Sequence, residues 1–87
     1  MLYDVVSIVW TEDPSRCEFY LETRTVEASS VDETYAHELA EELVDAWVSV
    51  ESGLVKRFIN GSDHGAYVED RYSGKARGIR VTVRSSQ

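Results

Sequence analysis

One amphipathic segment in the middle of the chain constrains the fold more than any other feature. Its large apolar side chains recur at spacings of four, four, four and three residues: Tyr35, Leu39, Leu43, Trp47 and Val50. Smaller apolar residues flank this stripe, and acidic residues occupy the opposite side. Ser30 followed by Glu33 matches a capping box, and Ser52-Gly53 is a stop signal. The pattern predicts a helix of about five turns with one apolar face to bury.

The segment before this helix has the pattern of a β-hairpin. Residues 2–10 are apolar on both alternating faces, as in a central strand or one covered on both sides. Residues 17–26 alternate between apolar and polar side chains, and Asp13-Pro14 between the two segments is a turn signal. We therefore expect two antiparallel strands joined by a loop of about five residues.

Three further strands are expected after the helix, at residues 54–59, 66–72 and 78–84. A polar loop from Asn60 through Gly65 separates the first two strands, and a turn at Ser73-Gly74-Lys75 separates the last two. A lone helix buries its apolar face most economically on a single sheet. The expected fold is therefore a single α+β domain over residues 1–87. Its antiparallel sheet has the order β-β-α-β-β-β, with the amphipathic helix packed on one face.

The bulk composition of the 87 residues limits the class of protein. A hydrophobic content of 43% indicates a globular chain, and the single cysteine, Cys17, excludes an internal disulfide and a cysteine-rich zinc site. The first residues lack a basic leader pattern, and no apolar run approaches the roughly 18 residues of a membrane span. We expect a cytoplasmic protein with no cofactor, no small-molecule substrate and no membrane contact.

Charge is distributed very unevenly along the chain. Residues 1–53 contain thirteen acids and two bases, whereas residues 54–87 contain three acids and seven bases, which together give the formal net charge of −7. No lysine or arginine occurs between Thr25 and Val55. A chain with this net charge repels nucleic acid and anionic membranes on average, so its expected partners are cationic protein surfaces.

The predicted helix concentrates these acids on the face opposite its apolar stripe. Side chains three or four residues apart on a helix are separated by about 5–6 Å, and phosphates along a nucleic-acid strand by about 3.4 Å of axis. A row of such carboxylates therefore resembles a run of phosphates. The alternative is a solvated face that keeps a small protein soluble. The candidate partner-binding residues are Glu38, Glu41, Glu42 and Asp45, with Asp32, Glu33 and Glu51 at the periphery.

The C-terminal strands form a second candidate surface, in which basic residues alternate with Tyr67 and Tyr72. Basic and aromatic side chains together hold phosphates and stack on bases. The alternative is that these bases pair with the molecule's own acids. The candidate nucleic-acid-binding residues are Arg71, Lys75, Arg77, Arg80 and Arg84.

The sequence shows little that resembles catalytic machinery. Ser62-Asp63-His64 has the residue types of a hydrolytic triad, but consecutive residues cannot adopt its geometry, and a polar loop tip is expected. His64 retains the option of a proton transfer with Asp63 or Asp70.

Two other residues, His37 and Cys17, are of types that bind metals or act as nucleophiles. His37 lies four residues from both Glu33 and Glu41, which suits either a weak metal site or, as we favour, a solvated histidine. Cys17 lies on the apolar side of its strand and is expected to be a buried hydrophobe rather than a nucleophile. We expect a protein that is not an enzyme and holds no metal.

A known family shares features of the first hairpin. Ser7-Ile8-Val9, Thr11, Pro14 and Glu18-Phe19-Tyr20-Leu21-Glu22 resemble the opening hairpin of a small phage-encoded anti-CRISPR family that inhibits type I-F systems. The resemblance covers sixteen of the 87 residues, and no functional residue is carried over from it. It implies a small acidic α+β inhibitor that blocks a crRNA-guided complex, in some cases as a mimic of DNA.

The sequence therefore supports one leading hypothesis and two alternatives. The first is an anti-CRISPR-type inhibitor, a monomer or weak dimer. Its acidic face would bind a protein complex with a cationic nucleic-acid-binding surface, possibly a CRISPR-Cas effector. The second is a nucleic-acid-binding regulator or antitoxin-like subunit that uses the basic C-terminal hairpin. The third is an acidic scaffolding subunit whose negative half meets the positive half of a neighbour.

Overall fold

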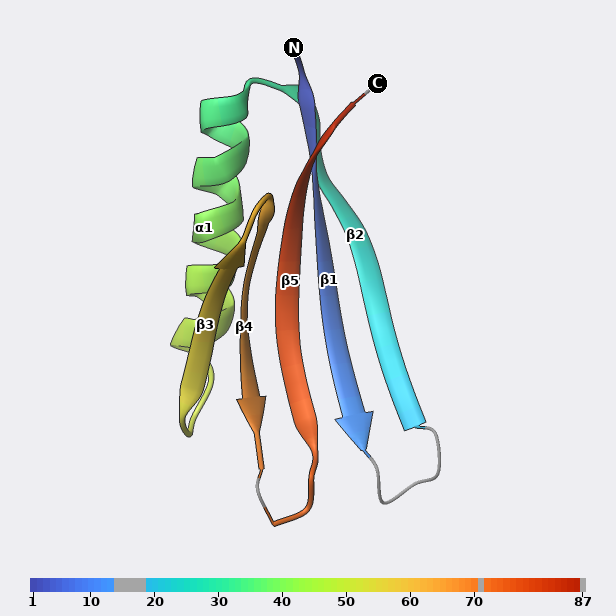
Figure 1. The fold of residues 1–87 in the computed structure, drawn as a ribbon, viewed down its shortest axis with the longest axis vertical. Helices are drawn as coiled ribbons and strands as arrows, with labels where there is room; N and C mark the ends of the chain where they lie inside the picture. The colour runs from blue at the N-terminus through green and yellow to red at the C-terminus, as the bar shows by residue number, and fades with distance from the viewer. Residues whose placement is uncertain (14–18, 71, 87) are drawn as a thin grey trace.

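The computed structural model describes residues 1–13, 19–70 and 72–86 and contains five strands and one helix in that part of the chain (Figure 1). In chain order the elements are β1 (Tyr3–Asp13), β2 (Phe19–Val31), α1 (Glu33–Ser49), β3 (Val55–Asn60), β4 (Asp63–Glu69) and β5 (Ala76–Ser85). The predicted α+β class and the order β-β-α-β-β-β are confirmed.

All five strands belong to one antiparallel sheet with the spatial order β2-β1-β5-β4-β3. The last strand, β5, lies between β1 and β4 and joins the N-terminal hairpin to the β3–β4 hairpin. The two chain ends consequently lie close together at one end of the sheet (Figure 1). The central position of β1 agrees with its apolar residues on both faces. The strands β2 and β3 form the two edges.

The N-terminus of α1 differs from the predicted capping box. Asp32 is the N-cap, and its Oδ1 accepts a hydrogen bond from the backbone N–H of Tyr35 at 2.9 Å. Ser30 still belongs to β2, where it has a positive φ of 56° and its N–H donates to the carboxylate of Asp4. The prediction of Ser30 as the cap was wrong, because β2 continues to Val31 and aspartate caps a helix as well as serine does.

The helix has the predicted length of about five turns, but its C-terminal end and its buried stripe need correction. The helix ends at Ser49, before Ser52-Gly53, and its most buried residues are Ala36, Ala40 and Val44. The predicted stripe lies beside this line: Leu39, Leu43 and Trp47 are half-buried, while Tyr35 and Val50 are 49% and 81% exposed. Alanine lets a helix backbone approach the sheet closely, so the small residues form the contact line and the large ones its flanks.

Strand limits differ from the prediction mainly at the hairpins. Asn60 pairs with Asp63, so the β3–β4 turn contains only Gly61 and Ser62, and residues 63–65 belong to β4 instead of a loop. Gly61 has a φ of +62°, which a two-residue turn of this kind requires at its first position. The strands β1 and β2 extend beyond residues 10 and 26, and the expected turn at Pro14 lies outside the described residues.

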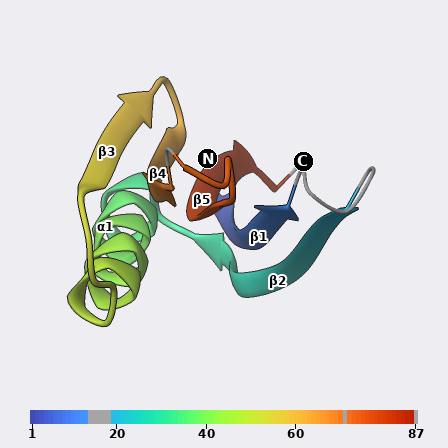
Figure 2. The same cartoon turned by 90° about the horizontal axis from the view of Figure 1, so that it is seen from below.

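The two faces of the sheet have different coverings (Figure 2). The helix packs on one face, against a core that includes Val5, Ala66, Ile79, Val81 and Val83. We call the other face the open face. Alternate residues point to it, as the strand register dictates.

Aromatic side chains cover part of the open face. The Trp10 ring lies over Gly78 and the Phe58 ring over Gly65, in contact positions that a Cβ atom would fill. Val6 and Ile8 on this face are only 3% and 4% exposed. The open face is therefore a second, thin apolar layer in addition to the core beneath α1.

Candidate partner-binding surface

The six principal acids predicted to bind a partner are all exposed on the surface of α1 and its N-cap. We call this set the acidic helix face: Asp32, Glu33, Glu38, Glu41, Glu42 and Asp45. The apolar side of the helix faces the sheet, so the amphipathic pattern directs these carboxylates to solvent. The helix contains no lysine or arginine, so its acids have no cationic partner on the same element.

Three members of the acidic helix face have partners within the molecule. Asp32 caps the helix, and Asp45 forms an ion pair with Arg57 on β3. The negative charge of Glu33, together with burial and a side-chain hydrogen bond to Glu33, raises the pKa of Tyr3 above its usual range. These acids therefore have structural roles, and the Arg57 guanidinium offsets the charge of Asp45.

The other three members, Glu38, Glu41 and Glu42, form the free part of the acidic helix face. Within residues 1–13, 19–70 and 72–86, no hydrogen bond or ion pair joins them to another side chain. Like charges at these helical spacings destabilise a helix by a few tenths of a kcal/mol per pair. The fold therefore keeps three mutually repelling carboxylates without compensation.

The bases of the second half do not form one surface. The Arg77 guanidinium bonds to Glu51 at 2.7 and 2.8 Å, and this hydrogen bond raises the pKa of Arg77. Lys75 lies 3.8 Å from Asp13 at the end of the sheet. Arg80 and Arg84 point to the open face, and Arg71 lies outside the described residues. The predicted alternative, pairing with the molecule's own acids, accounts for Lys75 and Arg77.

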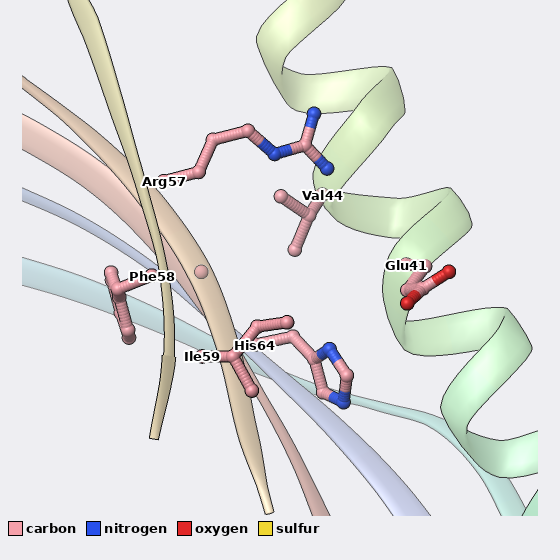
Figure 3. A pocket seen from close by; sticks show the side chains of 7 residues that line it. Glu41, Val44, Arg57, Phe58, Ile59 and His64 are labelled. Atoms are coloured by element: carbon pink, nitrogen blue, oxygen red, sulfur yellow. The ribbon is translucent and has the colours of Figure 1, made fainter.

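A pocket of about 470 Å³ lies beside the acidic helix face, between α1 and the β3–β4 hairpin. Its lining includes Glu41, Val44, Arg57, Ile59 and His64. Arg57 and His64 point toward α1, whereas Phe58 points to the other side of the sheet (Figure 3). The pocket thus places one cation and one free carboxylate at opposite walls.

One lining residue of this pocket, His64, contacts a second histidine on α1. His37 Nδ1 lies 2.9 Å from His64 Nε2, and the ring centroids are 5.1 Å apart. Because a hydrogen bond between imidazoles needs one donor and one acceptor, at least one ring accepts through a bare nitrogen. His64 is 7% exposed and His37 half-buried, so the expected polar loop tip and solvated histidine were both wrong. The short Gly61-Ser62 turn places His64 on β4, facing the helix.

The neighbours of His64 do not complete a catalytic arrangement. Asp63 points to the open face, where it accepts a hydrogen bond from Thr82 Oγ1 at 2.8 Å. Adjacent strand residues point to opposite faces, so Asp63 and His64 are separated by the sheet. In the described part of the chain, no three His, Cys, Asp or Glu side chains come together as a metal site would require. The predicted buried Cys17 lies outside that part.

Sequence reasoning missed a group of aromatic residues on the open face. A pocket of about 340 Å³ there is lined by Ile8, Trp10, Glu12, Tyr20, Phe58 and Arg80. The ring centroids of Phe58 and Tyr67 are 6.4 Å apart. The signal available in the sequence was Gly78 at the start of a predicted strand, since glycine in a strand often marks a close approach; Gly65 gave no such signal, because it falls in a predicted loop.

Comparison with known proteins identifies no relative of this chain. No protein-family model matches it, and no curated protein or solved structure matches it either. Across residues 1–13, 19–70 and 72–86, the one helix is too short and too polar to cross a bilayer.

Proposed function

We propose that the protein is a small, non-enzymatic inhibitor that binds a nucleic-acid-handling protein complex through the acidic helix face. The observation that carries this proposal is the exposure of Glu38, Glu41 and Glu42 on a helix without bases, with no partner among the described residues. A cationic partner that binds these carboxylates would relieve their mutual repulsion, and this accounts for their presence on the helix.

The proposed mechanism is electrostatic and steric competition. The carboxylates of the acidic helix face occupy the lysines and arginines that hold phosphates, and the body of the sheet blocks access to the nucleic-acid groove. The net charge of −7 steers the inhibitor toward a cationic groove and raises the association rate at low salt. Arg57 limits the negative surface at one end, since it neutralises Asp45.

The resemblance of the first hairpin to type I-F anti-CRISPR proteins suggests the class of partner. A crRNA-guided effector complex has a positively charged path for target DNA, and a phage-encoded inhibitor acts in the cytoplasm of the infected cell. We propose such an effector as the first partner to test. The geometry supports the acidic helix face as the binding surface. The choice of an effector complex as the partner comes from the resemblance of the first hairpin.

Charge reversal on the acidic helix face tests this proposal. The variant Glu38→Lys/Glu42→Lys changes two free carboxylates, and Glu12→Lys/Glu69→Lys changes the net charge equally at two exposed residues of the open face. Both proteins would be checked for folding by circular dichroism. Competition with labelled target DNA for a purified type I-F effector should be lost in the first variant and retained in the control. Equal competition by both folded variants would contradict the proposal.

A second candidate function uses the open face. Arg24, Lys56, Arg80 and Arg84 all point to this face, which also carries the rings of Trp10 and Phe58. Aromatic and cationic side chains on a sheet bind single-stranded nucleic acid in other folds. A gel shift with the isolated protein at low salt tests it. Binding that weakens as salt rises supports nucleic-acid recognition, and no binding at low salt excludes it.

A further inference from the structure

The outer edge of β2 has the features of a strand that pairs with another strand. Within the described residues no strand lies beyond it, and every residue from Tyr20 to Glu27 is exposed. Three of these are large apolar residues: Tyr20, Leu21 and Val26 are 54%, 57% and 57% exposed. The strand contains no lysine or proline, the residues that commonly block edge pairing. The opposite edge, β3, is six residues long and carries Lys56 and Arg57.

The regular part of this edge is short and well defined. The pairing of β2 with β1 runs without a shift from Phe19 to Val26. Register shifts follow between Val26 and Val31, and Ser30 has a positive φ there. Bulges bend and twist a strand away from regular pairing. Residues 20–26 are therefore the segment available to a partner strand, and Thr23 is its midpoint.

We propose that this edge pairs with the same edge of a second copy of the chain, antiparallel and with Thr23 opposite Thr23. A two-fold axis perpendicular to the sheet makes the contact self-complementary. In this register Glu22 lies opposite Arg24 of the second copy, twice by symmetry. Tyr20 lies opposite Val26, also twice, so exposed apolar side chains meet on the same face.

Charge selects this register from its neighbours. In a symmetric antiparallel pair with both helices on one face, one residue must lie opposite its own copy in the second chain. The two registers next to the Thr23-centred one are therefore centred on Glu22 and on Arg24. Centring on Glu22 places two Glu22 side chains opposite each other, and centring on Arg24 does the same for arginine. Like charges directly opposite destabilise a strand pair, whereas opposite charges stabilise it. The present contact between Arg24 and Glu22 within one strand is long, at 3.9 Å, and is easily exchanged for the cross-strand contact.

The pairing has a consequence for the acidic helix face. It produces a ten-stranded sheet with both helices on the same side, because the axis is perpendicular to the sheet. The helix lies mainly over β5, two strands from β2. With strands about 4.8 Å apart, the two helices are separated by roughly 24 Å. The proposed dimer does not depend on the proposed function. If the protein both dimerises and acts as proposed, the dimer presents two acidic helix faces to one partner.

Reversing one charge at a time tests the proposed pairing. Sedimentation velocity of the intact protein from 5 to 500 μM at 0.15 M salt should show a monomer–dimer equilibrium. Glu22→Arg alone and Arg24→Glu alone each turn two opposite-charge pairs into two like-charge pairs and should weaken dimerisation at least about tenfold. The double swap Glu22→Arg/Arg24→Glu, and an equimolar mixture of the two single variants, should restore it. A monomer at 500 μM, or a dimer that both single variants leave unchanged, overturns the proposal.

A cysteine pair reports the register itself. Residues directly opposite in an antiparallel pair have Cα atoms about 4.5–5.5 Å apart, within disulfide range. In a Cys17→Ser background, Thr23→Cys should therefore form an intermolecular disulfide under mild oxidation. Thr25→Cys, which also lies on the helix-covered face but opposite Leu21, should not. Equal cross-linking of both variants, or none in Thr23→Cys, overturns the Thr23-centred register.

Discussion

Gly65→Ala tests the packing of aromatic rings on the open face. A Cβ atom at residue 65 would overlap the Phe58 ring and lie 2.6 Å from the carbonyl oxygen of Ile79 on the neighbouring strand. The ring can turn away, but the carbonyl belongs to the sheet backbone, so the strands must separate slightly. We expect the alanine to destabilise the protein even though alanine normally suits a strand better than glycine.

The expected magnitude follows from overpacking. Inserting a methyl group into a packed site costs about 1–3 kcal/mol, and replacing glycine returns about 0.5–1 kcal/mol through the unfolded chain. The contact with a backbone carbonyl places the cost in the upper half of that range, so the net loss is about 1–2.5 kcal/mol out of a total stability of roughly 4–13 kcal/mol for 87 residues. For a domain of this size the melting temperature should fall by about 4–20 °C.

Thermal unfolding followed by circular dichroism measures this loss. Adding Phe58→Leu to Gly65→Ala removes the aromatic ring and leaves the carbonyl contact, so it should recover only part of the loss. Gly78→Ala, which meets Trp10 and the carbonyl of Ala66 in the same way, should behave alike. A melting temperature for Gly65→Ala within about 2 °C of the natural protein would refute the reasoning.

Three further predictions concern the helix cap, the acidic helix face and acid stability. Asp32→Ala removes the N-cap and should lower stability by about 1 kcal/mol in urea unfolding, whereas Ser30→Gly should not, since glycine suits the positive φ there. Arg57→Gln frees Asp45 and should tighten competition for the effector about threefold, so unchanged or weaker competition would count against the acidic face. Hydrogen bonds to the Asp70 carboxylate, first from the Tyr72 amide and second from the Ser73 hydroxyl, hold the pKa of Asp70 below its usual range. The stability that this carboxylate contributes is therefore complete above its pKa in the unfolded chain, about 3.9, and is lost as the pH falls through its lower pKa in the folded protein. Unfolding measured from pH 2 to 5 should show a shallower acid limb in Asp70→Asn than in the natural protein.

The class of fold was predictable because its signals are local. The spacing of Leu39, Leu43 and Trp47 identifies the helix, and alternation identifies the strands around it. The strand order was not predictable, since placing β5 between β1 and β4 depends on contacts far apart in the chain. The error at the N-terminus of the helix has a simple origin: Ser30 and Asp32 are both good caps, and only the end of β2 decides between them.

The candidate site was partly predictable for the same reason. Exposure of Glu38, Glu41 and Glu42 follows from the amphipathic pattern of one helix. The pairing of Asp45 with Arg57 and of His37 with His64 joins α1 to strands later in the chain, and no local pattern contains it. A turn shorter by a few residues was enough to move His64 from a loop tip to the inner face of the sheet.

The central claim is that Glu38, Glu41 and Glu42 carry the binding function. The most direct measurement is the inhibition constant against labelled target DNA on a purified type I-F effector. It compares the natural protein with Glu38→Lys/Glu42→Lys and the charge-matched control Glu12→Lys/Glu69→Lys. Each like-charge contact costs more than about 1.4 kcal/mol, so the helix variant should inhibit at least about 100-fold more weakly and the control within about threefold. A folded helix variant that inhibits as well as the control would contradict the claim.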